Sequence, residues 1–247
     1  WDQEIEGSVQ VEVLGPTGAT PVAPLTASEF AQRALSLATT IQATPALFQQ
    51  LRTGLYPVNS FVQPAQDAFG LANAGLADNI VSPAQYEIGD DEALIVESAA
   101  IPVRFRNIQL GNRWLESLDY ASRQTSLNGR QSYLDPDGTY RFVLAHRDPG
   151  VPNWLDIAGH PTGTIFMRWN KPLGGSAPGA NAYLVPLTAL REFLPADHPV
   201  VTPAERAATL ERRRQAYNRR TTPAGLALGR DRLQPVGPRR LARRPAP

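Results

Sequence analysis

The amino-acid sequence predicts a mainly β protein of the α+β class, built as an antiparallel, jelly-roll-like β-sandwich. Short runs of alternating apolar and polar residues recur after residue 90, turns rich in Gly and Pro separate them, and few helical patterns lie between them. Helical patterns fall instead in the N-terminal third and near the C-terminus. The 247 residues, 42% of them hydrophobic, are enough for a substantial buried core.

The N-terminal third is expected to contain a strand, two helices and a long irregular excursion, at residues 8–15, 26–42, 44–52 and 55–91. The strand prediction rests on alternating valines. Thr26 and Glu29 form a capping box that opens the first helix, and Pro45 suits the first turn of the second. We therefore expect a single β-sandwich domain over residues 1–201, with a helical excursion at 26–90.

After residue 90 the strand signals become regular, and strands are expected at 93–98, 101–107, 108–120, 131–134, 139–146, 163–169 and 182–185. The strand that begins at residue 108 also fits a helix, so we expect it to give way to a helical turn. Asp135, Pro136 and Gly138 occupy favoured positions of a type I turn, which predicts a hairpin between the strands on either side. A brief amphipathic helix is expected over 187–194.

The C-terminal segment differs from the rest of the chain in charge. Residues 202–247 contain twelve arginines and three carboxylates, a net charge of +9, which leaves −8 for residues 1–201. A capping box at Thr202 and Glu205 predicts a basic surface helix over 202–220, and the Pro- and Arg-rich residues 221–247 are expected to be extended or disordered. The expected partner of this basic arm is another copy in a homo-oligomer, or a preceding β-rich domain or subunit. Nucleic acid is disfavoured, because the arm lacks interleaved aromatic residues.

Several function classes are disfavoured by what the sequence lacks. It has no run of about 18 apolar residues, so a soluble protein without a membrane span is expected. It has no cysteine, which excludes disulfides and thiolate chemistry. No GxSxG motif and no phosphate-binding glycine loop is present, and no cofactor is predicted. No targeting peptide is visible at the start, which favours a cytoplasmic location.

Several runs of residues resemble the bacterial family called domain of unknown function 1214. They are DEALIVE at 91–97, NRW at 112–114, DYASRQTSLNGRQ at 119–131, LDPDGTYRFVLAHRDPGVPNWLD at 134–156 and VPLTALREFLP at 185–195. The likeness covers about residues 88–200, and PGVPNWLD is its most specific part. The resemblance implies a jelly-roll-like β fold and a longer architecture with another β-rich domain ahead of it. It implies no catalytic residue, because the activity of the family is not established.

The polar loop after residue 147 contains the first candidate site. Asp148 and Asp156 have the residue types of a glycan-hydrolysing pair, one carboxyl acting as acid and the other as base or nucleophile. Beside them, Trp154 would offer an apolar platform to a sugar ring, and Asn153 a further polar contact. The structural alternative is that these side chains bind loop amides and that Trp154 plugs the end of the sandwich. We favour this alternative, because loops across a sandwich end need such polar contacts.

Two of the three histidines lie near the same loop. His146 and His160 could join the neighbouring carboxylates in a metal site, but the close HxH spacing of such sites is missing, so no metal is predicted. Both histidines remain candidates for ligand binding, together with Arg147. The third histidine, His198, is expected to be exposed.

A second polar cluster precedes the loop. It consists of Asn112, Arg113, Asp119, Tyr120, Arg123 and Asn128. If these side chains face Asn153 and Asp156 across the sandwich, the two clusters form one site.

The sequence therefore predicts a β-sandwich module with a role in assembly or in binding a polar ligand, such as a carbohydrate or a lipid-derived group. The expected ligand-binding residues are Asn112, Arg113, Tyr120, Arg123, Asn128, His146, Arg147, Asn153, Trp154 and His160. The alternative is a glycan-directed hydrolase that uses Asp148 and Asp156 as catalytic residues. Whether the protein is an enzyme stays open at this point.

Overall fold

A computed structural model describes residues 24–50, 56–66 and 78–221 of the chain. The strand expected at 8–15 and nearly all of the arm expected at 221–247 lie outside these residues. The chain divides into two compact units, Trp1–Val201 and Thr202–Pro247. No helix of the described residues is long and apolar enough to cross a membrane.

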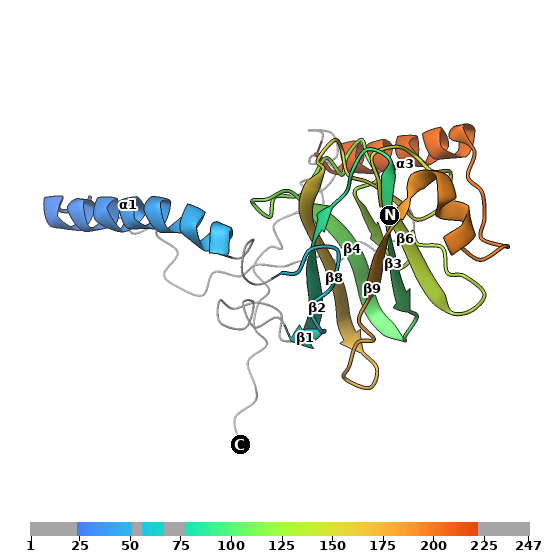
Figure 1. The fold of residues 1–247 in the computed structure, drawn as a ribbon. Helices are drawn as coiled ribbons and strands as arrows, with labels where there is room; N and C mark the ends of the chain where they lie inside the picture. Colours follow the sequence, from blue (N-terminus) through green and yellow to red (C-terminus); the bar gives the residue numbers. More distant parts are fainter. Residues whose placement is uncertain (1–23, 51–55, 67–77, 222–247) are drawn as a thin grey trace, which may run out of the picture. The chain divides into compact units, whose positions relative to one another are not determined.

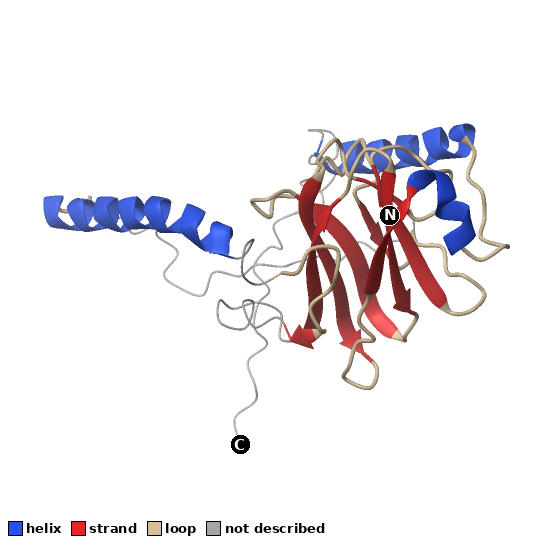
Figure 2. Ribbon diagram, viewed as in Figure 1, coloured by secondary structure: helices blue, strands red, loops and turns tan. Residues whose placement is uncertain are grey.

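The first unit contains one α-helix, nine short strands and a 3-10 helix among its described residues (Figures 1 and 2). The helices are α1 (Ala27–Gln50) and η2 (Leu187–Phe193). The strands are β1 (Ala65–Gln66), β2 (Asn79–Glu87), β3 (Glu92–Ala99), β4 (Val103–Gly111), β5 (Ser126–Asn128), β6 (Thr139–Ala145), β7 (Trp154–Asp156), β8 (Thr162–Pro172) and β9 (Asn181–Pro186). The described part of the second unit contains α3 (Pro203–Thr221).

The strands form two sheets, which we call sheet A and sheet B. Sheet A has the order β1-β2-β8-β4-β5, and sheet B has the order β7-β6-β3-β9. All neighbours are antiparallel except β6 and β7, which run parallel. The predicted mainly β, antiparallel sandwich is thus confirmed.

The main core lies between the two sheets. Alternate residues in the buried parts of β4 and β8 point into it, including Ile108, Leu110, Ile165 and Trp169, each at most 1% exposed. Each such side chain contributes about 1.5–3 kcal/mol by leaving water. The alternation of apolar and polar residues in the sequence therefore reflects the burial of one face of each strand.

A second core covers the outer face of sheet B. Residues of β3, β6 and β9 that point away from sheet A pack against η2 and the residue after it, Leu194. Sheet B is therefore buried on both faces, which explains why β3 contains the continuous buried run Ala93 to Val96. No second core is found on the outer face of sheet A among residues 56–66 and 78–201, and this face carries mostly polar side chains.

Both predicted capping boxes form, but one predicted helix boundary is wrong. The hydroxyl of Thr26 accepts a hydrogen bond from the Glu29 amide at 3.3 Å, and the carboxylate of Glu29 accepts one from the Thr26 amide at 2.8 Å. Thr202 and Glu205 make the same pair of bonds at the start of α3. The two helices expected at 26–42 and 44–52 are a single helix, α1, with Pro45 inside it. Proline removes one helical hydrogen bond, and here the helix continues past that loss.

The predicted hairpin around residue 135 is wrong in one arm. The turn forms, with Gly138 at φ +79° and its amide donating to the Asp135 carbonyl at 2.9 Å. Residues 131–134 are not a strand, however, and β6 pairs instead with β3 and β7. The reason is that this arm is held by a side chain, Asn153, in place of a strand ladder, as described below.

Other differences arise from local residue chemistry. The strands expected at 101–107 and 108–120 are one strand, β4, which ends at Gly111. The expected helical turn is instead an irregular loop, because the Asn112 side chain accepts the amides of Trp114 and Glu116. Strand β2 was not predicted, because Ser82, Pro83 and Ala84 interrupt its apolar pattern.

Candidate functional site

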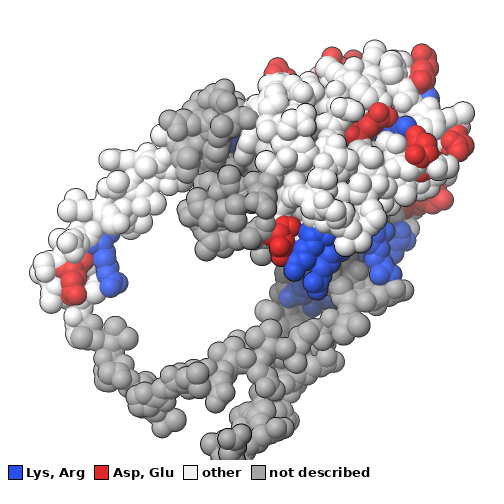
Figure 3. Space-filling model, turned by 90° about the horizontal axis from the view of Figure 1, so that it is seen from below, with Lys and Arg blue, Asp and Glu red and all other residues white. Residues whose placement is uncertain are grey.

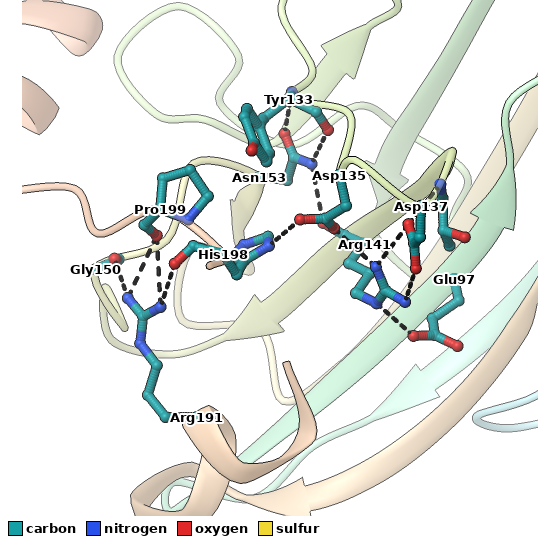
Figure 4. Close-up of polar contacts among 11 residues, drawn as sticks. Glu97, Tyr133, Asp135, Asp137, Arg141, Gly150, Asn153, Arg191, His198 and Pro199 are labelled. Atoms are coloured by element: carbon teal, nitrogen blue, oxygen red, sulfur yellow. Dashed lines mark hydrogen bonds and ion pairs between the residues drawn. The ribbon is translucent and has the colours of Figure 1, made fainter. Parts of the chain in front are cut away.

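Asn153, which lies in the PGVPNWLD run of the predicted loop, is a buried structural residue. Its side-chain oxygen accepts the Tyr133 amide at 2.7 Å, and its nitrogen donates to the carbonyls of Tyr133 at 2.8 Å and Arg141 at 2.9 Å (Figure 4). The residue is 0% exposed. It therefore joins the segment before the 135 turn to β6, and it is not accessible to a ligand.

A buried ionic network extends from the same turn. One oxygen of Asp135 lies 2.7 Å from Nδ1 of His198, and the other accepts Arg141 at 3.0 Å (Figure 4). Arg141 also binds the carboxylates of Asp137 and Glu97, each at 2.7 Å. The side chains of Asp135 and His198 are both 0% exposed, so the expectation of an exposed His198 is wrong. Proline-flanked polar residues suggested a surface loop, whereas the carboxylate of Asp135 provides a buried partner for the imidazole.

Charge in this network is unevenly balanced. A single guanidinium, that of Arg141, serves three carboxylates, and its hydrogen bonds lower the pKa of Asp137 to about 2. The same bonds raise the pKa of Arg141. Burial, with a smaller contribution from Glu97, raises the pKa of Tyr183 to about 12. These groups hold β3, β6 and the 135 turn together.

The segment after η2 is fixed by an arginine clamp. Arg191 donates to the carbonyls of Gly150 at 2.9 Å and His198 at 3.1 Å (Figure 4). The amide of Val201 donates to the same Gly150 carbonyl at 2.9 Å. The clamp and the buried His198 together hold residues 194–201 against the loop at 148–153.

The two predicted catalytic carboxylates bind backbone amides. Asp148 accepts the Gly150 amide at 2.9 Å. Asp156 accepts the Ala158 amide at 2.8 Å and pairs with Arg123 at 2.9 Å, and its side chain is only 8% exposed. These contacts are those of the structural alternative, and they leave the hydrolase alternative with less support.

The predicted platform is also closed. Trp154 is 7% exposed, packs in the second core, and donates its indole N–H to the Ala145 carbonyl at 3.1 Å. The prediction that Trp154 offers an open apolar surface to a sugar is therefore wrong. As a strand residue of β7, it points into the layer between sheet B and η2.

The remaining candidates near the loop are His146, His160 and Arg147. His146 contacts the Ile88 carbonyl at 3.2 Å, and Arg147 pairs with Asp91 at 2.6 Å, so both hold the β2–β3 connection. His160 is exposed. Within the described ranges, no group of three or more histidine and carboxylate side chains is arranged to hold a metal ion.

The second predicted cluster is partly brought together with the first. Arg123 reaches Asp156 through their ion pair, as expected if the clusters face one another. Asn112 and Asn128 instead accept amides of their own loops, and Arg113 lies over the Trp114 ring at 5.2 Å. Tyr120, another predicted ligand-binding residue, lines a pocket, and its side chain is half exposed.

This pocket lies beside β4 and β5, toward the outer face of sheet A. Its volume is about 330 Å³, and its lining residues are Gln109, Ser117, Tyr120, Thr125 and Ser126. The amide of Gln109 donates to the Ser117 hydroxyl at 2.6 Å, and Gln109 is opposite Ser126 in the strand register. Four of the five residues were not predicted, because polar residues that alternate with core residues look like an ordinary solvated strand face.

Further along the same face, sheet A carries aromatic rings. Phe166, opposite Gln109 in the register, packs edge to face against Tyr56 at 5.8 Å. Arg168 lies over the Phe166 ring at 4.9 Å and donates to Gln109 at 3.4 Å. The open face of sheet A thus combines amides, hydroxyls and aromatic rings on a rigid support.

The fold and pocket define a two-layer β-sandwich with one covered sheet and one open, polar sheet. No family model and no curated protein matches this chain. Among solved structures, an uncharacterised protein from Burkholderia cenocepacia is 32% identical, with a TM-score of 0.50, over 53% of this chain and 36% of that one. A protein from Vibrio parahaemolyticus is 15% identical, with a TM-score of 0.38, over 67% of this chain and 47% of that one. This chain thus spans about a third of the length of the Burkholderia protein and under half of the Vibrio protein.

Proposed function

We propose that this protein is a binding module for a neutral, polyhydroxylated ligand such as a carbohydrate, held in the pocket beside Tyr120. The observation that carries the proposal is the set of residues around the pocket. Gln109 has an amide, Ser117 and Ser126 have hydroxyls, Tyr120 has a phenol, and the buried Thr125 completes the lining without a charged residue. Such groups both donate and accept hydrogen bonds, which matches the hydroxyls of a sugar. A charged ligand would be left without a counter-charge among them.

The shape and support of the pocket agree with this ligand class. A volume of about 330 Å³ is at the lower end of the range typical of small-molecule sites. The half-exposed ring of Tyr120 supplies an apolar surface for one sugar face. Gln109 and Ser126 belong to paired strands, so their positions are fixed before the ligand binds.

We also propose that the chain belongs to the family called domain of unknown function 1214 and works as one module of a larger assembly. The resemblance of residues 88–200 to that family supports this proposal. The greater length of the Burkholderia protein agrees with a multi-module architecture. The partner would be a further copy of the chain or a separate β-rich domain.

Saturation-transfer NMR with a panel of neutral oligosaccharides tests the binding proposal. We expect transfer to at least one ligand in the wild type and its loss in Tyr120→Ala and Gln109→Ala. Phe105→Ala is the matched control, because Phe105 is an exposed aromatic residue on the same strand, four residues away. The proposal is wrong if no neutral glycan binds the wild type, or if binding survives both pocket substitutions.

A further inference from the structure

Arg106 is a half-buried arginine for which no ion pair is found among the described residues. Its alternation with Ile108 and Leu110 on β4 directs it toward the space between the sheets, and it lies opposite the core residue Trp169 in the register. Within residues 24–50, 56–66 and 78–221, no carboxylate forms an ion pair with it. This position, at one end of the sandwich, is separate from the Tyr120 pocket.

The guanidinium of Arg106 is incompletely satisfied. Its central carbon lies 2.9 Å from the centre of the Tyr140 ring, so it rests on an aromatic face from sheet B. Its Nη2 atom is buried and has no hydrogen-bond partner among the described residues. Burial lowers the pKa of Arg106 to about 10. A desolvated cation without a counter-charge is unfavourable, and an anion that reached it would remove that cost.

A small cavity lies next to this group. It has room for about 10 Å³, which is enough for one water-sized group. Its lining includes Arg106, Gly129, Ser132, Phe142 and Trp169. Gly129 packs closely against this side chain, because a Cβ at that position would lie 3.0 Å from Nε of Arg106.

The charges around this end of the sandwich favour an anion. Arg104 precedes Arg106 on the same face of β4, and Lys171 lies at the neighbouring end of β8. Lys171 pairs with Asp78, while Arg104 is exposed. Figure 3, which views the molecule from below, shows groups of Lys and Arg side chains, one of them with an acidic side chain directly beside it.

From the orphaned Nη2, the adjoining cavity and the missing counter-charge, we infer that Arg106 is a binding site for a carboxylate group. One carboxylate oxygen would fill the water-sized space and accept the free N–H, while the rest of the ligand remained at the mouth. Since one ligand atom fits this space, a planar carboxylate leaves a single further oxygen at the mouth, where a tetrahedral phosphate would leave three. The carboxylate could belong to a small acid or to the end of a peptide chain, which offer the same group.

Thermal unfolding in different sodium salts at one ionic strength and pH 7.5 tests the inference. We expect acetate to stabilise the wild type more than chloride or phosphate does. At a hundred times its dissociation constant, acetate would lower the unfolding equilibrium constant about 100-fold. The effect should vanish in Arg106→Gln and weaken without vanishing in Arg104→Gln, which removes a neighbouring charge only. It should persist in Arg147→Gln, the control, because Arg147 pairs with Asp91 on the β2–β3 connection, at the other end of the strands. A neutral peptide with a free C-terminal carboxylate, compared with its amidated form, shows whether chain ends bind as well as small acids.

Several results would overturn the inference. One is that acetate stabilises the wild type and Arg106→Gln equally. Another is that acetate does not stabilise the wild type. A third is that phosphate stabilises the wild type more than acetate does. If Arg106→Gln does not fold, the inference is tested by NMR on the wild type with ¹³C-labelled acetate. Contacts between the acetate methyl group and the ring protons of Tyr140 or Trp169 are expected in nuclear Overhauser spectra, and their absence at saturating acetate contradicts a site at Arg106.

Discussion

Single polar side chains hold the loops of this sandwich more than backbone ladders do. Asn153 bonds three backbone groups that no strand pairing satisfies, and Asp135 anchors a histidine that lies 63 residues away in the sequence. Asn153 stands in the polar loop that looked functional in the sequence, and Asp135 stands in the predicted turn before it. Buried polar groups with every partner in place specify one loop conformation, and a functional role is not needed to explain them.

Replacement of Asn153 should be costly for that reason. In Asn153→Ala the amide of Tyr133 and the carbonyls of Tyr133 and Arg141 lose their partner in a buried site. Since each buried unsatisfied group costs about 1–3 kcal/mol, we expect a loss of about 3 kcal/mol in the free energy of unfolding, measured by urea denaturation. Asn128→Ala removes comparable amide contacts in an exposed turn and should cost about 1 kcal/mol. Equal losses in the two variants would contradict a buried role for Asn153.

Asp137 makes the stability of the domain sensitive to acid. Its pKa falls from 3.8 to about 2 on folding, chiefly because Arg141 hydrogen-bonds its carboxylate. The unfolded chain therefore binds more protons in this window, so the contribution is present above pH 3.8 and is lost as pH falls through 2. In Asp137→Asn, the slope of unfolding free energy against pH between 2 and 4 should decrease by up to about one bound proton. Urea denaturation across this range measures the slope, and an unchanged slope would refute the assignment.

At the scale of elements, η2 covers the outer face of sheet B and buries the second core. Leu190, its buried residue, is 3% exposed and packs in the second core with Ile95 and Val185. Leu190→Ala should therefore reduce the free energy of unfolding by about 2–5 kcal/mol. Leu184→Ala, on the adjoining strand β9 at 39% exposure, should cost less than about 1 kcal/mol. If both substitutions cost the same in urea denaturation, η2 does not close this core.

Sequence patterns predicted the elements that are specified by residues close together in the sequence. The capping boxes at Thr26 and Thr202, and the alternating strand β4, are of this kind. Strand β2 was missed, since its core face includes Ser82, whose hydroxyl binds the Val62 carbonyl at 2.5 Å. That partner comes from a segment twenty residues earlier, and local periodicity carries no information about it.

The candidate site was predicted less well than the fold, for a related reason. Asn153, Asp156 and Trp154 have the residue types of a binding site, but their partners in the folded chain occupy them. Gln109 and Ser126 look like ordinary outward residues of a strand, and they form a pocket because β4 pairs with β5 in that register. A sequence shows which groups are polar, whereas pairing decides which of them remain open to a ligand.

At the scale of the whole molecule, the charge is separated along the chain. The first unit carries −8 and the segment 202–247 carries +9. Charges of opposite sign on separate parts of one chain favour attraction between copies, which is screened by salt. Both hydrophobic cores lie within the first unit, so the folding of the sandwich and the assembly of copies are separable properties.

A chain that ends at Val201 tests this separation. We expect it to keep the unfolding midpoint of the sandwich in urea, since all residues of the two cores remain. If the basic segment joins copies, the full chain should have a mass in light scattering that is a multiple of 26.9 kDa at low salt and falls toward one copy at high salt. The shortened chain should then have the mass of one copy at every salt concentration. A full chain of single-copy mass at low salt would exclude a role of the arm in homo-oligomers, and a lowered midpoint would show that the sandwich depends on residues 202–247.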